Sequence, residues 1–452
     1  MDIRALARKA IGTARKEGAS QAEVFAVSAV TRAAYVDDGR IKIVEEKSDQ
    51  GIAMRVLKGR KLAQSSSSCS TAGEAEACAR TAARLADRSP QTRNYERLPS
   101  PGRVTVTVNN RDPAVSSTDP VALAELMKAA VGAALDHGAK VPKALLRTAT
   151  IESTVMNTNG VEVTNLSTLV YAELNAMAEG APAGEGICNY SSPWLGGFDP
   201  EAIGRKVAEQ AKAARGAKPL EGTLKVPVLI APSELADMLD GSVSFSVSAE
   251  NINRKRSAWG ELLGQRVASE ALTVTDDPSD PRGPLSAPYD DEGVPTAVRP
   301  VIEDGVLRNF LYDSYNAAAA GRPGSGNGVR RRATDAQYLF QSPLGCGHLN
   351  LVVKPGTRSP ERTIASLGEG VVVEKFAFPT VNPFSGAFAL EVRLARLVKD
   401  GGEVGAIKHA LLVGNIYEGL RNVREVCSDA ATVGSMVLPT VAFDGFEVIG
   451  SK

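Results

Sequence analysis

Histidine is scarce in this sequence: His137, His348 and His409 are the only three among 452 residues. No two of them lie within one helical turn of each other, and none falls in the stretch Val226–Lys255. A zinc peptidase built on a helix needs two imidazoles about one turn apart, with a glutamate beside them. We therefore expect no histidine-based metal site in that stretch, and we interpret each histidine as an ordinary core or surface residue.

Cysteines are few, and long apolar runs are absent. The five cysteines (Cys69, Cys78, Cys188, Cys346 and Cys427) include no C-x-x-C pair, which is typical of reduced thiols in a reducing compartment. No stretch approaches the roughly 18 consecutive apolar residues that cross a bilayer. The first residues form an amphipathic pattern without the apolar centre of a signal peptide. A soluble cytoplasmic protein without membrane contact is predicted.

An excess of charge of either sign is also missing. Lys and Arg together number 52, and so do Asp and Glu. A chain with zero net charge has no long-range attraction to phosphate backbones or to anionic lipids. The composition therefore argues against nucleic acid as a partner.

The first half of the chain mixes helical and strand patterns. Apolar residues at helical spacing predict helices over 3–17 and 71–86, and helices that begin at Asp119-Pro120 and Asp199-Pro200. Alternating or apolar segments predict strands over 24–30, 40–45, 51–57, 145–156 and 161–178, the last two around the turn Asn159-Gly160. The pattern is that of an α+β domain over residues 1–222, an antiparallel sheet with helices on one face.

The second half, residues 223–452, has shorter strand patterns broken by Gly and Pro. A buried strand over 226–231 precedes Pro232 and a helical pattern, and a late helix is predicted over 414–425. The remaining predicted strands are 272–275, 296–302, 306–311, 349–353, 371–376, 387–398, 403–413 and 436–443. Many short strands at this spacing favour a strongly curved or barrel-like antiparallel sheet with helices.

Three polar segments could carry function. Asp276-Asp277-Pro278 and Tyr289–Gly293 together contribute five acids, which could bind a hard cation such as Ca²⁺ or Mg²⁺. The same sequences are also ordinary turn chemistry, the interpretation we favour. The segment Gly321–Gly328 lacks the Gly-Lys-Ser/Thr ending of a phosphate loop and is interpreted as a loop that could border a binding cavity.

Four stretches resemble one known family. They are ARKEGASQAEVF (14–25), NRK with GQRVASEALTVTDDP (253–278), YDDEGVPT with VIEDGVLRNFLYD (289–313), and GSMVLPTVAFDGFEVIG (434–450). In these stretches the chain resembles the TldD/PmbA family, and within it the PmbA (TldE) branch. The resemblance implies two domains, the first α+β and the second a curved, barrel-like sheet.

The resemblance also implies what stands at the family's zinc site. In the TldD branch, His-Glu-x-x-x-His and a later Cys bind zinc and cleave peptides. With Asn253-Arg254-Lys255 aligned, Gly241 and Ser246 stand where the two histidines would be, and Ser242 where the glutamate would be. Cys427 falls near the thiolate position, but one sulfur cannot supply three protein ligands. No catalytic or metal-binding residue is therefore expected in this chain.

Members of this branch pair with a TldD-like subunit that carries the zinc. We expect a non-catalytic subunit of a cytoplasmic heterodimeric metallopeptidase that closes a chamber around short or unfolded peptides and presents a strand edge to them. Two alternatives stay open: a non-enzymatic peptide-binding or regulatory homodimer, and an independent enzyme with a hard cation on the acids 290–292. Five residues are expected to border the cavity or contact peptide: Asp290, Asp291, Glu292, Asn327 and Arg330.

Overall fold

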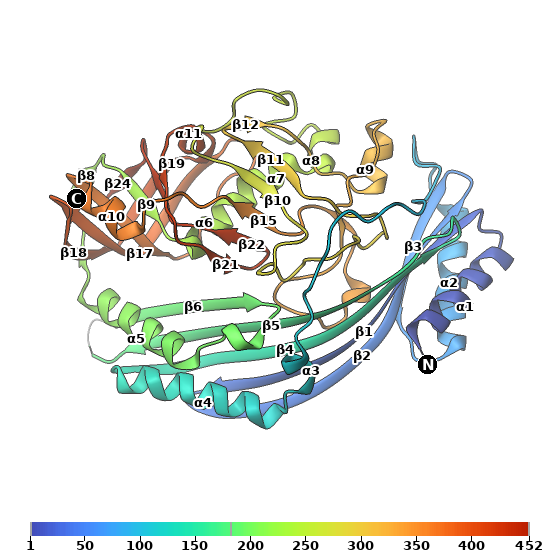
Figure 1. The fold of residues 1–452 in the computed structure, drawn as a ribbon, viewed down its shortest axis with the longest axis horizontal. Helices are drawn as coiled ribbons and strands as arrows, with labels where there is room; N and C mark the ends of the chain where they lie inside the picture. The colour runs from blue at the N-terminus through green and yellow to red at the C-terminus, as the bar shows by residue number, and fades with distance from the viewer. Residues whose placement is uncertain (1, 181–182, 451–452) are drawn as a thin grey trace.

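One long antiparallel sheet curves through the first half of the chain (Figure 1). The computed structural model describes residues 2–180 and 183–450. The strands of this sheet lie in the order β3-β2-β1-β4-β5-β6. Their bounds are β1 (Gln21–Asp37), β2 (Arg40–Lys58), β3 (Lys61–Ser68), β4 (Ala139–Asn157), β5 (Glu162–Ala178) and β6 (Gly184–Ser192).

This sheet is wider than the sequence pattern predicts. The predicted strands 40–45 and 51–57 are one continuous strand, β2. The pattern predicts neither β3, which ends in four serines, nor β6, which contains two glycines. Both lie at the edges of the sheet, where polar residues are tolerated and help to prevent unwanted pairing. Their sequences therefore lack the apolar alternation by which a strand is recognised.

Helices cover the convex side of the sheet in two pairs, α1 with α2 and α4 with α5 (Figure 1). The predicted starts at Asp119-Pro120 and Asp199-Pro200 are confirmed, since each Asp side chain accepts a hydrogen bond from the first turn of its helix. The predicted helices over 3–17 and 71–86 are confirmed as well. The bounds are α1 (Ile3–Lys16), α2 (Ala72–Arg88), α3 (Pro113–Ser117), α4 (Pro120–Asp136) and α5 (Pro200–Gly216).

The sheet is buried on both faces where the C-terminal half lies in its concave side. Successive residues of β1 point to opposite faces, so Val24 packs with α1 and α2 while Phe25 packs with Leu339 and Phe340 of the C-terminal half. Phe340 lies over Gly51 of β2, where a Cβ would come within 2.5 Å of the ring. Glycine at this position therefore allows the two halves to pack closely.

The C-terminal half contains a ten-stranded sheet, a six-stranded sheet and a two-stranded sheet. The strands are β7 (Lys218–Pro219), β8 (Thr223–Leu224), β9 (Val228–Ile230), β10 (Val274–Asp276), β11 (Arg299–Glu303), β12 (Val306–Leu307), β13 (Gly328–Val329), β14 (Gly345–Cys346), β15 (Leu351–Val353), β16 (Glu369–Phe376), β17 (Ala387–Lys399), β18 (Gly402–Lys408), β19 (Ala410–Asn415), β20 (Val423–Val426), β21 (Ala431–Val433), β22 (Met436–Leu438), β23 (Val441–Phe443) and β24 (Glu447–Ile449).

Short helices connect these strands. They are α6 (Pro232–Leu239), α7 (Phe245–Val247), α8 (Ala249–Asn253), α9 (Ser314–Ala319), α10 (Pro360–Ala365) and α11 (Ile416–Arg421), with a π-helix η2 (Asp240–Ser244) and the 3-10 helix η3 (Leu339–Gln341). The 3-10 helix η1 (Leu195–Gly197) lies in the N-terminal half, between β6 and α5. Across residues 2–180 and 183–450, no helix is long and apolar enough to span a bilayer.

The predicted α+β class is confirmed, but the C-terminal sheets are mixed and open, not antiparallel and barrel-like. The pairs β9–β16, β15–β22 and β7–β18 are parallel. The ten-stranded sheet runs between end strands β20 and β8 within the described residues. A run of three apolar residues carries no information on strand direction, because a buried strand has the same composition in either orientation.

Three C-terminal boundaries also differ from the prediction. The predicted strand 403–413 is two strands, β18 and β19, separated by His409 at a positive φ of 55°. The predicted strand 436–443 is likewise divided into β22 and β23, and the predicted helix 414–425 ends at Arg421 before β20. The division of the chain at residue 222 into two domains stays a prediction.

An ion-pair network joins the two halves. Glu23 of β1 lies opposite Arg55 of β2 in the sheet register. Two hydrogen bonds of 2.8 Å link their side chains. Arg55 also lies 2.7 Å from Glu292 of the C-terminal half, and all three side chains are at most 2% exposed. Burial raises the pKa of Glu23, and the adjacent guanidinium opposes this shift.

We predict that Arg55→Met lowers the free energy of unfolding by about 3–5 kcal/mol, because it leaves two carboxylates buried without a counter-charge. The control is Arg8→Met, which removes an arginine 2.7 Å from Glu162 where both side chains are more than half exposed. Such a surface pair contributes about 0–1 kcal/mol. Urea denaturation of both variants measures the difference, and equal losses would contradict the role given to Arg55.

Candidate functional site

The segment that begins with α6 contains a π-helical turn. Pro232 occupies the first turn of α6, and the segment continues through η2 and α7 to α8. Within η2 the N–H of Phe245 donates to the carbonyl of Asp240, the i→i+5 bond of a π-helix. A π-turn brings residues five apart nearer to one face than an α-helix does, and such turns occur frequently at functional sites. Gly241 and Ser246 have this spacing.

The side chains at these positions do not fit a zinc ion. The Ser242 hydroxyl donates to the Met238 carbonyl at 2.6 Å, and the Ser246 and Tyr417 hydroxyls lie 2.8 Å apart. A Cβ at Gly241 would come within 2.7 Å of Val381 Cγ2. The space that a histidine would need at residue 241 is therefore filled by valine. Neither of the two hydroxyls is among the usual zinc ligands.

Cys427 lies in a different environment. Its thiol is buried and donates to Thr363 Oγ1 at 3.5 Å, and its backbone bonds to Thr440 and Gly356. These partners come from outside the segment that contains Gly241. Burial raises the pKa of the Cys427 thiol to about 11, so it is protonated at neutral pH. Within the described part of the chain, no three His, Cys, Asp or Glu side chains are grouped to hold a metal.

The three histidines occupy separate structural positions. His137 ends α4, with Nδ1 2.8 Å from the Ala133 carbonyl. His409 separates β18 from β19. His348 Nε2 lies 3.0 Å from Ser435 Oγ, and burial lowers the pKa of this imidazole to about 4. The imidazole is therefore neutral at pH 7 and far from the pKa of an efficient general base.

Asp290 and Asp291 accept hydrogen bonds from the backbone around them. Asp290 accepts the N–H groups of Glu292, Val294 and Gly328, each at 2.9 Å. Asp291 accepts the N–H of Arg330 at 2.6 Å. Burial, and next the Glu292 charge, raise the pKa of Asp290. Both carboxylates are 2% exposed, and this geometry matches the turn interpretation of the acidic segment.

The other three candidates are also buried. Glu292 accepts the Ser314 N–H at 2.7 Å in addition to its ion pair with Arg55. Asn327 donates to Asp276 Oδ2 at 2.6 Å, and Arg330 donates to the Ser342 carbonyl at 2.7 Å. The structure brings Asp290, Asp291, Glu292 and Arg330 into one region, while Asn327 bonds to the neighbouring β10. Contact of any of the five with a peptide stays a prediction.

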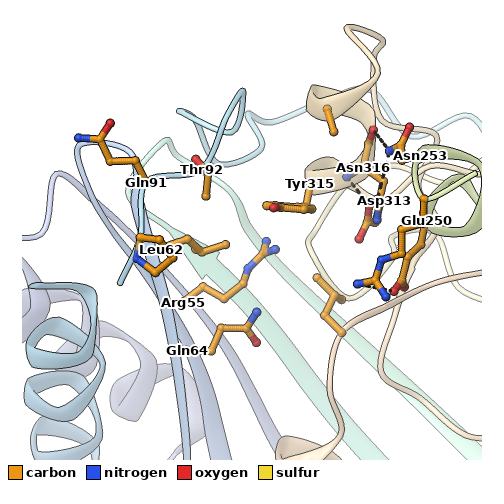
Figure 2. Close-up of a pocket in the computed structure, with 14 residues that line it drawn as sticks. Arg55, Leu62, Gln64, Gln91, Thr92, Glu250, Asn253, Asp313, Tyr315 and Asn316 are labelled. Atoms are coloured by element: carbon orange, nitrogen blue, oxygen red, sulfur yellow. Dashed lines mark hydrogen bonds and ion pairs between the residues drawn. The ribbon is translucent and has the colours of Figure 1, made fainter. Parts of the chain in front are cut away.

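A cavity of about 570 Å³ opens between the two halves of the chain (Figure 2). Arg55, Leu62 and Gln64 line it from the N-terminal sheet. Asp313 and Glu250 line it from the C-terminal half. This volume is in the range of small-molecule and peptide sites. A second cavity, of about 400 Å³, lies beside the π-turn and shares Glu250 with the first.

None of the residues that line the first cavity is among the site residues predicted from the sequence. Arg55 lies inside a strand and Asp313 at a helix start, where each is an ordinary residue by local pattern. The sequence does contain one signal for Arg55, which is a charged residue between apolar neighbours in a predicted strand. A charge at such a position is expected to be buried and therefore to need a partner of opposite charge. The identity of that partner depends on the tertiary structure.

The filled position at Gly241 gives a testable prediction. Gly241→Ala is expected to destabilise the protein, because overpacking against stiff Val381 costs about 1–3 kcal/mol while the helix gains about 1 kcal/mol at most. In a Val381→Ala background the same change is expected to be neutral or stabilising. The control Gly12→Ala in α1, with no atom within 4 Å of its Cβ, is expected to stabilise. Additive effects of the Gly241 and Val381 changes would contradict this contact.

Comparison with known proteins shows the fold and the family. The structure resembles the crystal structure of TldE from Thermococcus kodakarensis, with a TM-score of 0.90, 23% identity, and coverage of 98% of this chain and 100% of that one. Two curated relatives are an uncharacterized protein of Methanocaldococcus jannaschii, 27% identical over 292 residues, and Metalloprotease PmbA of Escherichia coli O157:H7, 26% identical over 254.

These curated matches are partial. They span 64% of this chain and 65% of the first relative, and 54% of this chain and 51% of the second. Three family models match this chain in order. They are the PmbA/TldA metallopeptidase domain 1 over residues 22–86, the central domain over 110–215 and the C-terminal domain over 223–450. Since the C-terminal match alone covers half of the sequence, the chain belongs to the PmbA/TldD metallopeptidase family.

Proposed function

We propose that this chain is the non-catalytic, TldE-type subunit of a heterodimeric metallopeptidase, and that a TldD-like partner supplies zinc and cleaves the peptide. The observation that carries the proposal is the set of residues at the positions where the resemblance would put the zinc-site residues. Gly241 is closed off by Val381, and the hydroxyls of Ser242 and Ser246 are engaged with Met238 and Tyr417. The π-turn of this chain therefore presents no side chain at positions 241, 242 or 246 that is a usual zinc ligand.

The chain's contribution to the complex is to close the chamber and to present short or unfolded peptides. An edge strand such as β3 can receive an extended peptide through main-chain hydrogen bonds, which gives affinity with little side-chain selectivity. We place the complex in the cytoplasm, a proposal supported by five free cysteines.

The proposal is tested by reconstitution. The isolated chain is expected to contain no stoichiometric zinc and to cleave no peptide. An equimolar mixture with the TldD-like subunit of the same organism is expected to hydrolyse unstructured peptides faster than that subunit alone, because closure of the chamber completes the site. Metal analysis of each purified subunit and the hydrolysis rate of a fluorogenic peptide provide the measurements.

Two controls make the result specific. A variant of the partner without its zinc-binding histidines should be inactive in the mixture. A Gly241→Ala, Val381→Ala variant of this chain should restore hydrolysis as well as the native chain does, since neither residue takes part in chemistry. Chelator-sensitive cleavage by the isolated chain would refute the proposal. A mixture no more active than the partner alone would favour the peptide-binding or regulatory homodimer.

A further inference from the structure

The cavity between the two halves combines a strand edge with a buried carboxylate (Figure 2). Gln64 belongs to β3, the last strand on its side of the sheet. Only the start of β3 has a partner on its outer side within the described residues, through the bridge from Lys61 to Gln91. Asp313 and Tyr315 line the opposite wall. An extended chain in the cavity would therefore lie beside a strand edge on one side and polar groups on the other.

Carboxyl groups outnumber cations in the buried network to which Arg55 and Asp313 of this cavity belong. The buried charged side chains of the connected network are the carboxylates Glu23, Asp290, Asp291, Glu292 and Asp313 and the guanidiniums Arg55, Arg330 and Arg331, all at most 7% exposed. The network thus contains two more carboxyl groups than guanidinium groups. Burial, together with the Glu292 charge, raises the pKa of both Asp290 and Asp313. A cation that entered the cavity would relieve this imbalance.

Asp313 is the member of these five carboxylates that lines the cavity. It is 5% exposed and is fixed as the N-cap of α9, where Oδ1 accepts the Asn316 N–H at 2.7 Å. The Tyr315 ring is 40% exposed and packs on Tyr95 with ring centroids 5.4 Å apart. An aromatic face beside a carboxylate is a favourable environment for an ammonium group. By contrast, Glu250 at this cavity is already paired with Arg254 at 3.1 Å.

We propose that this cavity binds the α-ammonium group of a short peptide, with Asp313 as its counter-charge, Tyr315 beside it and the outer edge of β3 along the peptide backbone. The inference deepens the proposed function, on which it rests for the choice of a peptide as ligand. It places one peptide-binding site in this chain itself, formed jointly by the N-terminal sheet and the C-terminal half.

Calorimetric titration of the isolated full-length chain with tri-alanine tests the proposal. Tri-alanine and its C-terminal amide are expected to bind equally, because the proposed site makes no contact with the C-terminal carboxylate of the peptide. N-acetyl-tri-alanine is expected to bind about 10- to 100-fold more weakly, as expected for loss of a charge-assisted hydrogen bond. Free alanine, which has no extended backbone to pair with β3, is expected to bind more weakly than tri-alanine.

Asp313→Asn should weaken tri-alanine binding by the same factor, since asparagine caps a helix as well as aspartate but carries no charge. The matched control Asp119→Asn makes the same change at the N-cap of α4, away from the cavity, and should bind like the native chain. The comparison of acetylated with free peptide uses the native protein, so it decides the question even if Asp313→Asn fails to fold.

Three results would overturn the inference: no binding of tri-alanine, equal binding of the acetylated peptide, or loss of binding on amidation alone. Loss of binding on amidation would indicate that an arginine binds the C-terminal carboxylate of the peptide instead. Equal binding of free alanine would remove the role given to β3. Because no partner subunit is present, these outcomes are independent of the reconstitution experiment, and failure of one proposal can be told from failure of the other.

Discussion

The contact between Arg55 and Glu292 determines how the two halves of this protein fit together. Both side chains are withdrawn from water, so each ion depends on the other and on Glu23 for its stability. The sheet contributes one carboxylate and the guanidinium, and the loop of the C-terminal half contributes the second carboxylate. Because a buried ion pair is costly to break, this contact fixes the register between the concave sheet and the loop.

In the same network, Asp290 and Asp291 of the acidic segment accept hydrogen bonds from the backbone, while Asp313 lines the cavity. Asp290 and Asp291 are held by backbone N–H donors of their own turn and of the segment 328–330, at and just after β13. The charge of Glu292 raises the pKa of Asp313, which stands where the halves separate to form the cavity. The cavity thus arises at the junction of the halves, and its lining combines groups that neither half brings together alone.

The segment around Gly241 shows how packing can fill the space beside a π-helical turn. The π-turn brings residues five apart toward one face, and Val381 fills the space that a side chain at residue 241 would need. Small residues at positions 241, 242 and 246 allow this packing. A well-filled helix turn of this kind has a defined shape and contributes to stability.

Local sequence determined the α+β class, the capped helices at Asp119 and Asp199, the strand pattern over 51–57, and the lack of paired imidazoles, since periodicity, capping and composition act over a few residues. The edge strands β3 and β6, the parallel pairs of the C-terminal half and the divisions at His409 were decided by tertiary structure, because short or polar strands owe their pairing to distant partners. The meeting of Arg55 with Glu292, the packing of Val381 on Gly241 and the cavity beside Asp313 also required the fold. Each of these features joins residues far apart in the chain, and no local sequence pattern predicts which of these residues come into contact.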